Sequence, residues 1–263
     1  MAQIINTNVM SLNAQRNLNK NSASLGTALQ RLSSGLRINS SIDDAAGLAV
    51  AQKMESQIRG MTVAMRNASD GISFAQTADT ALATAADQLQ RMRELATQSL
   101  NGTLSDTERS KIDQEYSALQ AEASRIQTVA KLNGQSVYGT FSFQVGADSS
   151  DTISGTFTSV AITGSNVSTS GGASSALASI DTWLGNVATN RAAIGGVQSR
   201  LTFTISYLEG ARENQAAAKS RIMDADFAAE TAGLTRAQIL QQAGTAMVSQ
   251  ANQVPQNVLT LLR

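Results

Sequence analysis

The 263-residue sequence contains no cysteine and no histidine. These two absences exclude disulfide bonds, cysteine nucleophiles and zinc sites built from either residue. They also remove the side chain that most often performs acid–base catalysis near neutral pH. The phosphate-binding, nucleophile-elbow and dinucleotide-binding glycine motifs are missing as well. We therefore expect no enzymatic activity, no cofactor and no metal site.

Charged residues are scarce, at 15% of the chain, against about 25% in typical soluble domains. Lysine plus arginine and aspartate plus glutamate are balanced at 20 each. A net charge near zero removes the repulsion that keeps like-charged proteins apart, so it favours self-association. It also argues against a nucleic-acid partner, which would favour a basic surface.

Long apolar stretches are missing too. No run of 18 apolar residues is present, so we expect no transmembrane helix and no membrane insertion. The first 20 residues have neither a basic start nor an apolar run of seven, and they do not resemble a Sec-type signal peptide. If the protein is exported, we expect a route that reads no such signal.

Proline occurs once, as Pro255. Because proline breaks helices, its near absence permits long uninterrupted ones. Apolar residues recur at the a and d positions of heptads in both halves of the chain, which is typical of helices that pack along a narrow seam. Near the N-terminus this seam comprises Leu18, Leu25, Leu29, Leu32 and Leu36. Near the C-terminus it comprises Leu240, Gly244, Met247, Ala251, Val254, Val258 and Leu261.

Local signals delimit the first two helices. Gly35 and residues 37–44 interrupt the first helix, and a second helix, roughly 80 Å long, is predicted from about 45 to about 100. Its candidate N-caps are Ser41, Asp43 and Asp44. Two adjacent aspartates also suit metal or acid–base chemistry, but at a helix start they more often serve as cap and dipole partners. Asn101-Gly102 is expected to stop this helix in a left-handed conformation.

The sequence pattern changes after the third predicted helix. Ser105 and Glu108 form the capping-box pattern that begins this helix, and Asn133-Gly134 is expected to end it. From about 135 to 172, apolar and polar residues alternate with β-branched and aromatic enrichment, which predicts short strands or hairpins. Residues 165–175 have the composition of a Ser/Gly linker, and helical periodicity resumes at about 176.

Helices of this length need other long helices to cover their seams, so the two ends of the chain are expected to pair side by side. The predicted fold is mainly α, a long antiparallel helical bundle or coiled coil formed by the N- and C-terminal segments, with a small β-hairpin insert. We predict two domains. Residues 1–42 with 223–263 form a discontinuous terminal coiled-coil domain, and residues 43–222 form a helical rod with the β insert at about 135–172.

Five separated segments, in the same order along the chain, resemble bacterial flagellin. LQRLSSGLRINSSIDDAAGLAVAQKM (29–54) is similar to the N-terminal signature of that family, and SQANQVPQNVLTLLR (249–263) is similar to its C-terminus. Residues 89–109, 143–154 and 220–244 resemble successive parts between them. Because the resemblance covers nearly the whole chain, it is far more specific than one short motif.

The resemblance implies a structural subunit that polymerises into the extracellular flagellar filament for swimming motility. It implies export through the flagellar type III secretion channel without a cleaved signal peptide. The implied partners are further copies of the chain, the hook-junction and cap proteins, a cytoplasmic export chaperone on the C-terminal helix, and the animal Toll-like flagellin receptor. Residues 155–175 leave no room for the outer domains that many flagellins carry, so a short, core-only form is expected.

Two sets of site residues are proposed. By resemblance, Arg91, Leu95 and Glu115 match positions that the Toll-like receptor reads and that contact neighbouring subunits in the filament. Without the family, they are a solvated charge pair beside a packing leucine. The second set is a polymerisation seam comprising Leu25, Leu29, Leu32, Leu36, Met247, Val254, Val258 and Leu261.

In a lone subunit the two chain ends have no third helix to cover them, and isolated helices are marginal in water. We hypothesise that residues 1–42 and about 223–263 are largely disordered in the free monomer and fold when neighbouring subunits cover them. The alternative functions are a hook–filament junction protein, which also has helical termini, and a secreted coiled-coil effector, which would remain soluble.

Overall fold

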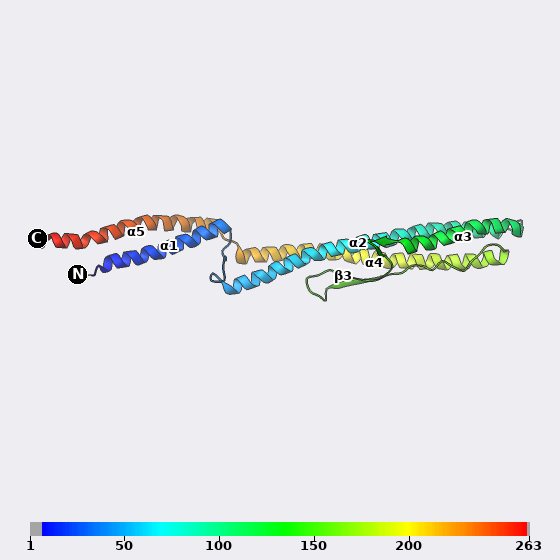
Figure 1. The fold of residues 1–263 in the computed structure, drawn as a ribbon, viewed down its shortest axis with the longest axis horizontal. Helices are drawn as coiled ribbons and strands as arrows, with labels where there is room; N and C mark the ends of the chain where they lie inside the picture. The colour runs from blue at the N-terminus through cyan, green and yellow to red at the C-terminus, as the bar shows by residue number, and fades with distance from the viewer. Residues whose placement is uncertain (1–6, 262–263) are drawn as a thin grey trace. The chain divides into compact units, whose positions relative to one another are not determined.

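The computed structural model describes residues 7–261, and it describes side chains from 7 to 253. Within that range there are five α-helices, and two small β-hairpins lie between the third and the fourth (Figure 1). The helices are α1 (Val9–Ser34), α2 (Ala45–Ser99), α3 (Asp106–Val129), α4 (Ser170–Met223) and α5 (Phe227–Leu261). The strands are β1 (Lys131–Leu132), β2 (Gln135–Ser136), β3 (Gly139–Gln144) and β4 (Thr152–Phe157). The prediction of a mainly α fold with a β-hairpin insert is confirmed.

The chain divides into two compact units. One comprises Met1–Ser56 and Asn214–Arg263, and the other comprises Gln57–Glu213. The first, which we call the terminal unit, contains α1, α5 and the adjoining ends of α2 and α4. The second, the central unit, contains α3, both hairpins and the rest of α2 and α4. The domain boundaries expected from the sequence, at 42/43 and 222/223, stay a prediction.

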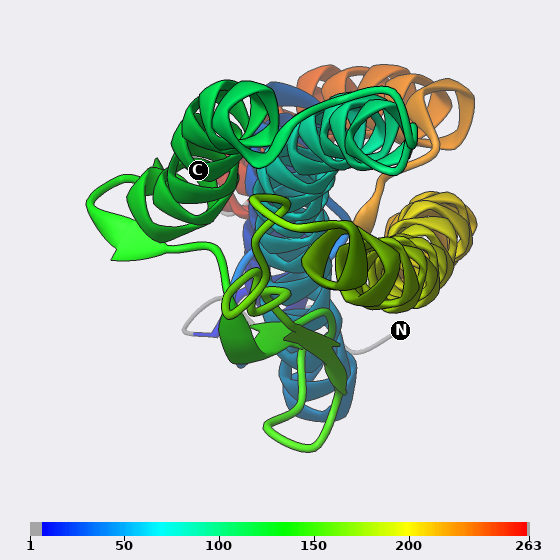
Figure 2. The same ribbon diagram turned by 90° about the vertical axis from the view of Figure 1, so that its right-hand side faces the viewer.

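In the central unit α2, α3 and α4 lie side by side (Figures 1 and 2). The inward face of α2 follows the predicted heptad spacing and is almost completely buried, at Ala75, Ala78, Leu82, Ala85, Leu89, Met92 and Ala96. Four of these seven positions are alanine, which allows the helix backbones to approach closely. The facing positions of α4 are larger, including the fully buried Ile180, Ile194 and Leu201.

The β3–β4 hairpin covers α2 with aromatic side chains. The strands pair antiparallel from Gly139–Phe157 to Gln144–Thr152. On the inward face, Phe74 of α2 has its ring centroid 4.5 Å from that of Phe141 and 6.3 Å from that of Phe157. These distances lie in the range where aromatic pairs attract. Burial of alternate residues along β4 is the period-2 pattern from which strands were predicted.

Residues 158–169 form no strand, yet they are firmly packed between α3 and α4 (Figure 2). Val160, Ile162 and Val167 are buried. Gln127 of α3 bonds both backbone groups of Val160, with Val160 N–H donating to Oε1 at 2.6 Å and Nε2 donating to the Val160 carbonyl at 3.2 Å. We call this segment the strap. Its backbone is satisfied by side chains rather than by a strand partner.

The predicted linker at 165–175 is therefore wrong. Val167 is fully buried, and α4 begins at Ser170, earlier than the expected start near 176. Thr169 caps this helix, because its Oγ1 accepts from Gly172 N–H at 3.1 Å. The Ser/Gly-rich residues therefore include the N-cap of α4, and their glycines lie in the first turn of that helix.

Several predicted helix ends are confirmed. α1 ends at Ser34, and Gly35 has φ 72° with its N–H donating to the Arg31 carbonyl. Asp44 caps α2, since its Oδ1 accepts from Gly47 N–H at 2.8 Å. Ser105 and Glu108 form the expected capping box at the start of α3.

Two other expected stops differ from the prediction, because α2 ends at Ser99 as expected but without a left-handed residue, and α3 ends before Asn133-Gly134. Neither Asn101 nor Gly102 has a positive φ, so α2 ends without a left-handed residue. Instead the buried Arg109 of α3 donates to the Ser99 carbonyl at 2.8 Å and to the Asn101 carbonyl at 3.0 Å. Asn133 and Gly134 do adopt positive φ, of 51° and 80°, but they form the β1–β2 turn after α3 has ended at Val129.

Candidate functional site

In the terminal unit α1 and α5 pair along most of their lengths, running antiparallel (Figure 1). The facing residues follow a heptad spacing on both helices. On α1 they are Ser11, Ala14, Leu18, Asn21, Leu25, Ala28 and Leu32. On α5 they are Glu230, Leu234, Ala237, Gln241, Gly244, Val248 and Ala251. Many of these residues are small or polar, so the seam between the two helices buries little apolar surface.

Polar bonds are distributed along this seam. Asn8 Nδ2 donates to the Ala251 carbonyl at 2.7 Å, and Ser11 Oγ donates to Asn252 Oδ1 at 2.8 Å. Further along, Asn21 Nδ2 donates to the Ala237 carbonyl at 2.7 Å. Polar groups at seam positions fix helix register at a cost in stability. The pair is therefore well aligned but weakly stabilised by its own contacts.

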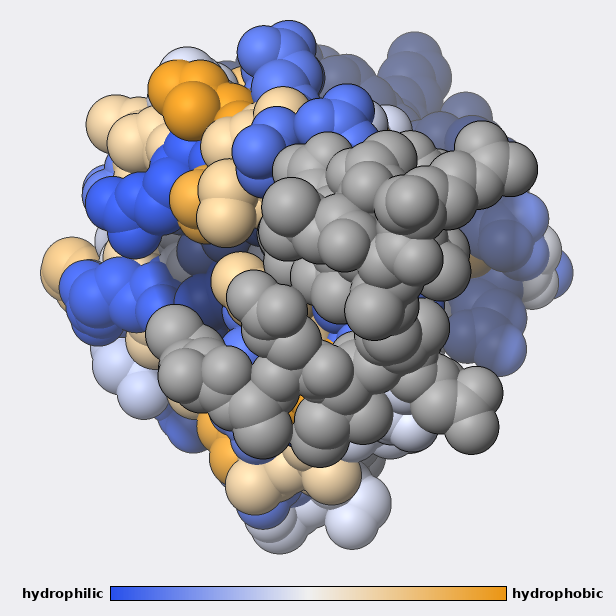
Figure 3. Space-filling view, turned by 90° about the vertical axis from the view of Figure 1, so that its left-hand side faces the viewer, coloured by the Kyte–Doolittle hydropathy of each residue, from blue (hydrophilic) through white to orange (hydrophobic). Residues whose placement is uncertain are grey.

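The larger apolar side chains of these helices point elsewhere. Leu29 is 50% exposed and Met247 is 60% exposed. More than half of the side-chain surface is also exposed at Val9, Met10, Leu12, Ile239 and Leu240. Figure 3, a view from the left-hand side of Figure 1, shows apolar surface interspersed with hydrophilic surface. Contiguous exposed apolar surface marks a protein interaction site.

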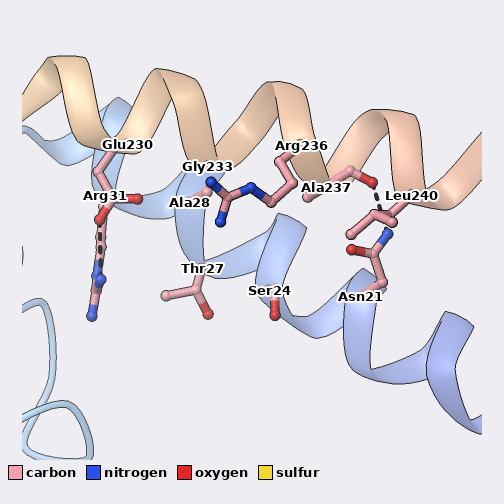
Figure 4. A pocket seen from close by; sticks show the side chains of 10 residues that line it. All are labelled: Asn21, Ser24, Thr27, Ala28, Arg31, Glu230, Gly233, Arg236, Ala237 and Leu240. Carbon is pink, nitrogen blue, oxygen red and sulfur yellow. Dashed lines mark hydrogen bonds and ion pairs between the residues drawn. The ribbon is translucent and has the colours of Figure 1, made fainter.

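Part of this surface is a groove between the two helices. An apolar hollow of about 530 Å³ lies near Met10 and Met247, and a polar hollow of about 440 Å³ lies near Arg31 and Arg236 (Figure 4). Asn21 and Leu240 line both hollows, so the two hollows adjoin each other. We call the whole the α1–α5 groove. It has an apolar end and a charged end.

Charged residues are few on the helix pair. Within the described side chains, α1 and α5 carry only Arg16, Lys20, Arg31, Glu230 and Arg236. Arg31 Nη1 bonds Glu230 Oε1 at 3.0 Å. Residues 237–261 contain no charged residue at all. That stretch can be buried without the penalty of desolvating a charge.

The residues of the predicted polymerisation seam differ in their burial and in their neighbours. Leu25 and Leu32 are half-buried between α1 and α5, whereas Leu29 and Met247 are exposed. Leu36 is half-buried against a separate cluster of the terminal unit formed by Ile38, Ala51 and Met223. Val254, Val258 and Leu261 fall within α5, but their side chains lie outside the described residues.

The sequence interpretation missed the polar members of the seam. Asn8, Ser11 and Asn21 bridge the helices, but a search for apolar heptads passes over them. The signal was their spacing, because Ser11 and Asn21 share a heptad register with Leu18 and Leu25.

The second predicted set lies in the central unit. Arg91 Nη2 bonds Glu115 Oε1 at 2.9 Å, which links α2 to α3, and Arg91 Nη1 bonds Glu94 Oε2 at 2.9 Å. Hydrogen bonds to Glu94 and then to Glu115 raise the pKa of Arg91. Leu95, however, is buried in the core beneath this network. The side chains of Arg91 and Glu115 are half-exposed. The side chain of Leu95, by contrast, is inaccessible to a protein partner.

The two adjacent aspartates before α2 have structural roles. The Asp43 carboxylate accepts from Ser40 N–H at 2.9 Å and from Asn39 N–H at 3.1 Å, and these bonds lower its pKa. It closes the loop that precedes α2, while Asp44 caps that helix. Among the described residues, no group of three or more acidic side chains is placed to hold a metal ion. Over the same residues, no helix is both long and apolar enough to span a membrane.

Comparison with known proteins gives matches over nearly the full length. The family model for the bacterial flagellin N-terminal helical region matches residues 5–140, and that for the C-terminal helical region matches residues 177–262. A flagellin from Halalkalibacterium halodurans is 44% identical over 271 residues, which cover 99% of this chain and all of the relative. The flagellar filament 33 kDa core protein of Treponema phagedenis is 41% identical over 285 residues, with the same coverage. The crystal structure of Bacillus cereus flagellin matches with a TM-score of 0.51 and 28% identity, over 54% of this chain and 88% of that chain.

Proposed function

Because this chain belongs to the bacterial flagellin family, we propose that it is a structural subunit that polymerises into the extracellular flagellar filament through the α1–α5 groove. The observation that carries the proposal is the uncovered apolar surface of α1 and α5 in a chain whose central core is well packed. Filaments need contacts between two different patches, because such contacts do not close into a ring.

Assembly supplies what the helix pair lacks. Fully burying a leucine, isoleucine or methionine contributes about 1.5–3 kcal/mol. Leu29, Leu240 and Met247 are each roughly half-exposed, so covering them contributes about 1 kcal/mol apiece. The loss of backbone entropy when the terminal segments become ordered opposes this gain. Folding of these segments is therefore coupled to growth on an existing end, and spontaneous nucleation is slow.

The domain assignment follows from the same reasoning. Residues 1–42 with 223–263 form the inner core of the filament, where helices from many subunits cover each other. Residues 43–222 form the surrounding rod, which is already stable in a single subunit. The polymerisation seam of Leu25, Leu29, Leu32, Leu36 and Met247 belongs to the inner core, together with Val254, Val258 and Leu261.

Export and assembly partners are part of the proposal. The subunit leaves the cell through the flagellar type III channel, and an export chaperone covers the C-terminal helix before that step. Hook-junction and cap proteins then receive it at the filament. The uncharged, apolar C-terminal stretch from 237 to 261 supports this, because such a surface needs a cover whenever it is not assembled.

Seeded growth tests the function. Purified subunits are mixed with short filament fragments, and filament length is followed by electron microscopy. We expect micrometre-long extension, and deletion of residues 254–263 should abolish it while the circular dichroism of the central helices persists. Persistent monomer in the full-length sample, or a thin ring that does not elongate, would contradict the proposal. The ring would favour a junction protein, and soluble monomer would favour an effector.

Recognition by the animal Toll-like flagellin receptor is a further part of the proposal. The exposed Arg91–Glu115 pair supports it, and the buried Leu95 acts by holding α2 and α3 in place. In a reporter-cell assay, Arg91→Ala should reduce the response to monomer. Arg93→Ala is the matched control, because Arg93 is an exposed arginine on the same helix that pairs with Asp181 instead. An unchanged response to Arg91→Ala removes this assignment.

A further inference from the structure

At the charged end of the α1–α5 groove, two arginines, Arg31 and Arg236, lie beside a single carboxylate, Glu230. Arg31 and Glu230 balance each other at 3.0 Å. Arg236 extends across the groove toward α1 (Figure 4) and has no hydrogen bond or ion pair within the described residues. One guanidinium is therefore left without a counter-charge at this end of the groove.

Acidic groups of the terminal unit are already engaged. Glu55 bonds Lys219 at 2.7 Å, and Glu230 bonds Arg31. The remaining four carboxylates accept bonds close to their own positions, with Asp43 closing its loop, Asp44 capping α2, Asp224 accepting from Ser220 and Asp226 capping α5. Each of the six already accepts a bond, and Glu230, which pairs with Arg31, is the one that lines the same hollow as Arg236.

The two units have opposite charge balances. The terminal unit contains nine basic and six acidic residues, whereas the central unit contains eleven basic and fourteen acidic residues. An assembly in which terminal helices of one copy contact central-unit carboxylates of another brings opposite charges together. Such complementarity fixes orientation and suppresses wrong arrangements more than it raises affinity.

We propose that the Arg236 guanidinium binds an aspartate or glutamate from residues 57–213 of a second copy, and that this contact sets the axial register of assembly. The inference rests on the proposed polymerisation. Burying the Arg236 guanidinium between two copies without a counter-charge would be costly, and the planar guanidinium suits a carboxylate. Beyond Arg236, the uncharged heptads of α5 provide no charge to distinguish one register from a shift of one heptad.

Substitution tests the charge at this position. Arg236→Gln should slow seeded filament growth at low salt by tenfold or more, and it should flatten the decrease in growth rate that added salt causes in the wild type. Arg16→Gln is the matched control, because Arg16 is an exposed arginine on α1 that does not line the groove. We expect that control to stay within twofold of the wild type. Equal behaviour of the two variants would overturn the inference.

Cross-linking identifies the partner carboxylate. Arg236→Lys keeps the charge and introduces an amine that a water-soluble carbodiimide joins to a nearby carboxylate. Filaments are grown from a mixture of isotopically light and heavy subunits, so mass spectrometry separates links within a chain from links between chains. We expect a link between chains from position 236 to an acidic residue in 57–213, absent from unassembled subunits. A link only to Glu230 of the same chain, or none in intact filaments, would refute the inference. If wild-type subunits do not extend seeds, the proposed function fails first, and the inference fails with it.

Discussion

Replacing Gln127 by methionine tests how the strap is held. Gln127 is 4% exposed, and its amide bonds both the N–H and the carbonyl of Val160. Methionine has nearly the same length and fills the same space, but it offers no comparable hydrogen bond. The substitution therefore removes the two bonds while leaving the packing almost unchanged.

The expected cost follows from the two backbone groups left behind. Val160 is 6% exposed, so water does not readily replace the lost partner. Each buried backbone group without a partner costs about 1–3 kcal/mol. The apolar side chain of methionine offsets part of this cost. We predict that Gln127→Met lowers the free energy of unfolding by about 3 kcal/mol.

Urea titration followed by fluorescence measures this effect at the strap itself. Trp183 is the only tryptophan, and it borders a hollow whose other lining residues include Thr158, Val160 and Ala161. Gln114→Met is the matched control, because Gln114 is exposed on the same helix. We expect the control to change the unfolding free energy by less than about 0.5 kcal/mol. Equal midpoints for the two variants would refute the claim that Gln127 anchors the strap.

Four further predictions concern the central unit. Ser105→Ala should lower the free energy of unfolding by about 1 kcal/mol, since it removes the capping box of α3, and urea denaturation measures this. Burial raises the pKa of Tyr138 to about 12, so the unfolded chain, with its phenol near pKa 10.0, loses the proton first. Stability should therefore fall between pH 10 and 12, and Tyr138→Phe should reduce that fall relative to the wild type in alkaline denaturation. Gly185→Ala should raise the melting temperature, because open space surrounds the added methyl group and alanine favours the helix by about 1 kcal/mol. Gly71→Ala should lower it, because the methyl group would lie 3.0 Å from Phe143.

The first three helices were predictable because their signals are local. A heptad spacing, a capping box at Ser105 and a glycine at position 35 depend only on neighbouring residues. The predicted second helix and the observed α2 agree to within a residue at each end. Such segments fold as their sequence suggests because tertiary packing supports the local preference.

The strap was not predictable in this way. Its burial depends on Gln127, Ser124 and Asp113 of α3, which bond its backbone from a distant part of the sequence. No periodicity within residues 158–169 reports those bonds, and the Ser/Gly composition after them is typical of a linker. The contact is visible only once the helix and the segment are placed together.

The predicted N-terminal seam combines residues that lie on two faces of α1. Leucines at 29 and 36 were included in one seam with those at 25 and 32, but the seam between the helices continues through the smaller Ala28. On this pair of helices, the largest apolar residues are divided between the face toward the partner helix and an exposed face. Sequence periodicity detects the apolar residues of both faces, but it does not show which face packs against the partner helix.

Hydrogen exchange of monomer and filament tests the central claim most directly. The α1–α5 pair has only four buried side chains among its described residues, Ser11, Ala28, Ala237 and Ala251. We predict that in monomers the amides of both helices exchange far faster than those of residues 60–100, and that in filaments they become strongly protected. Equal protection of the terminal and central helices in the monomer would contradict an assembly surface that folds with the polymer.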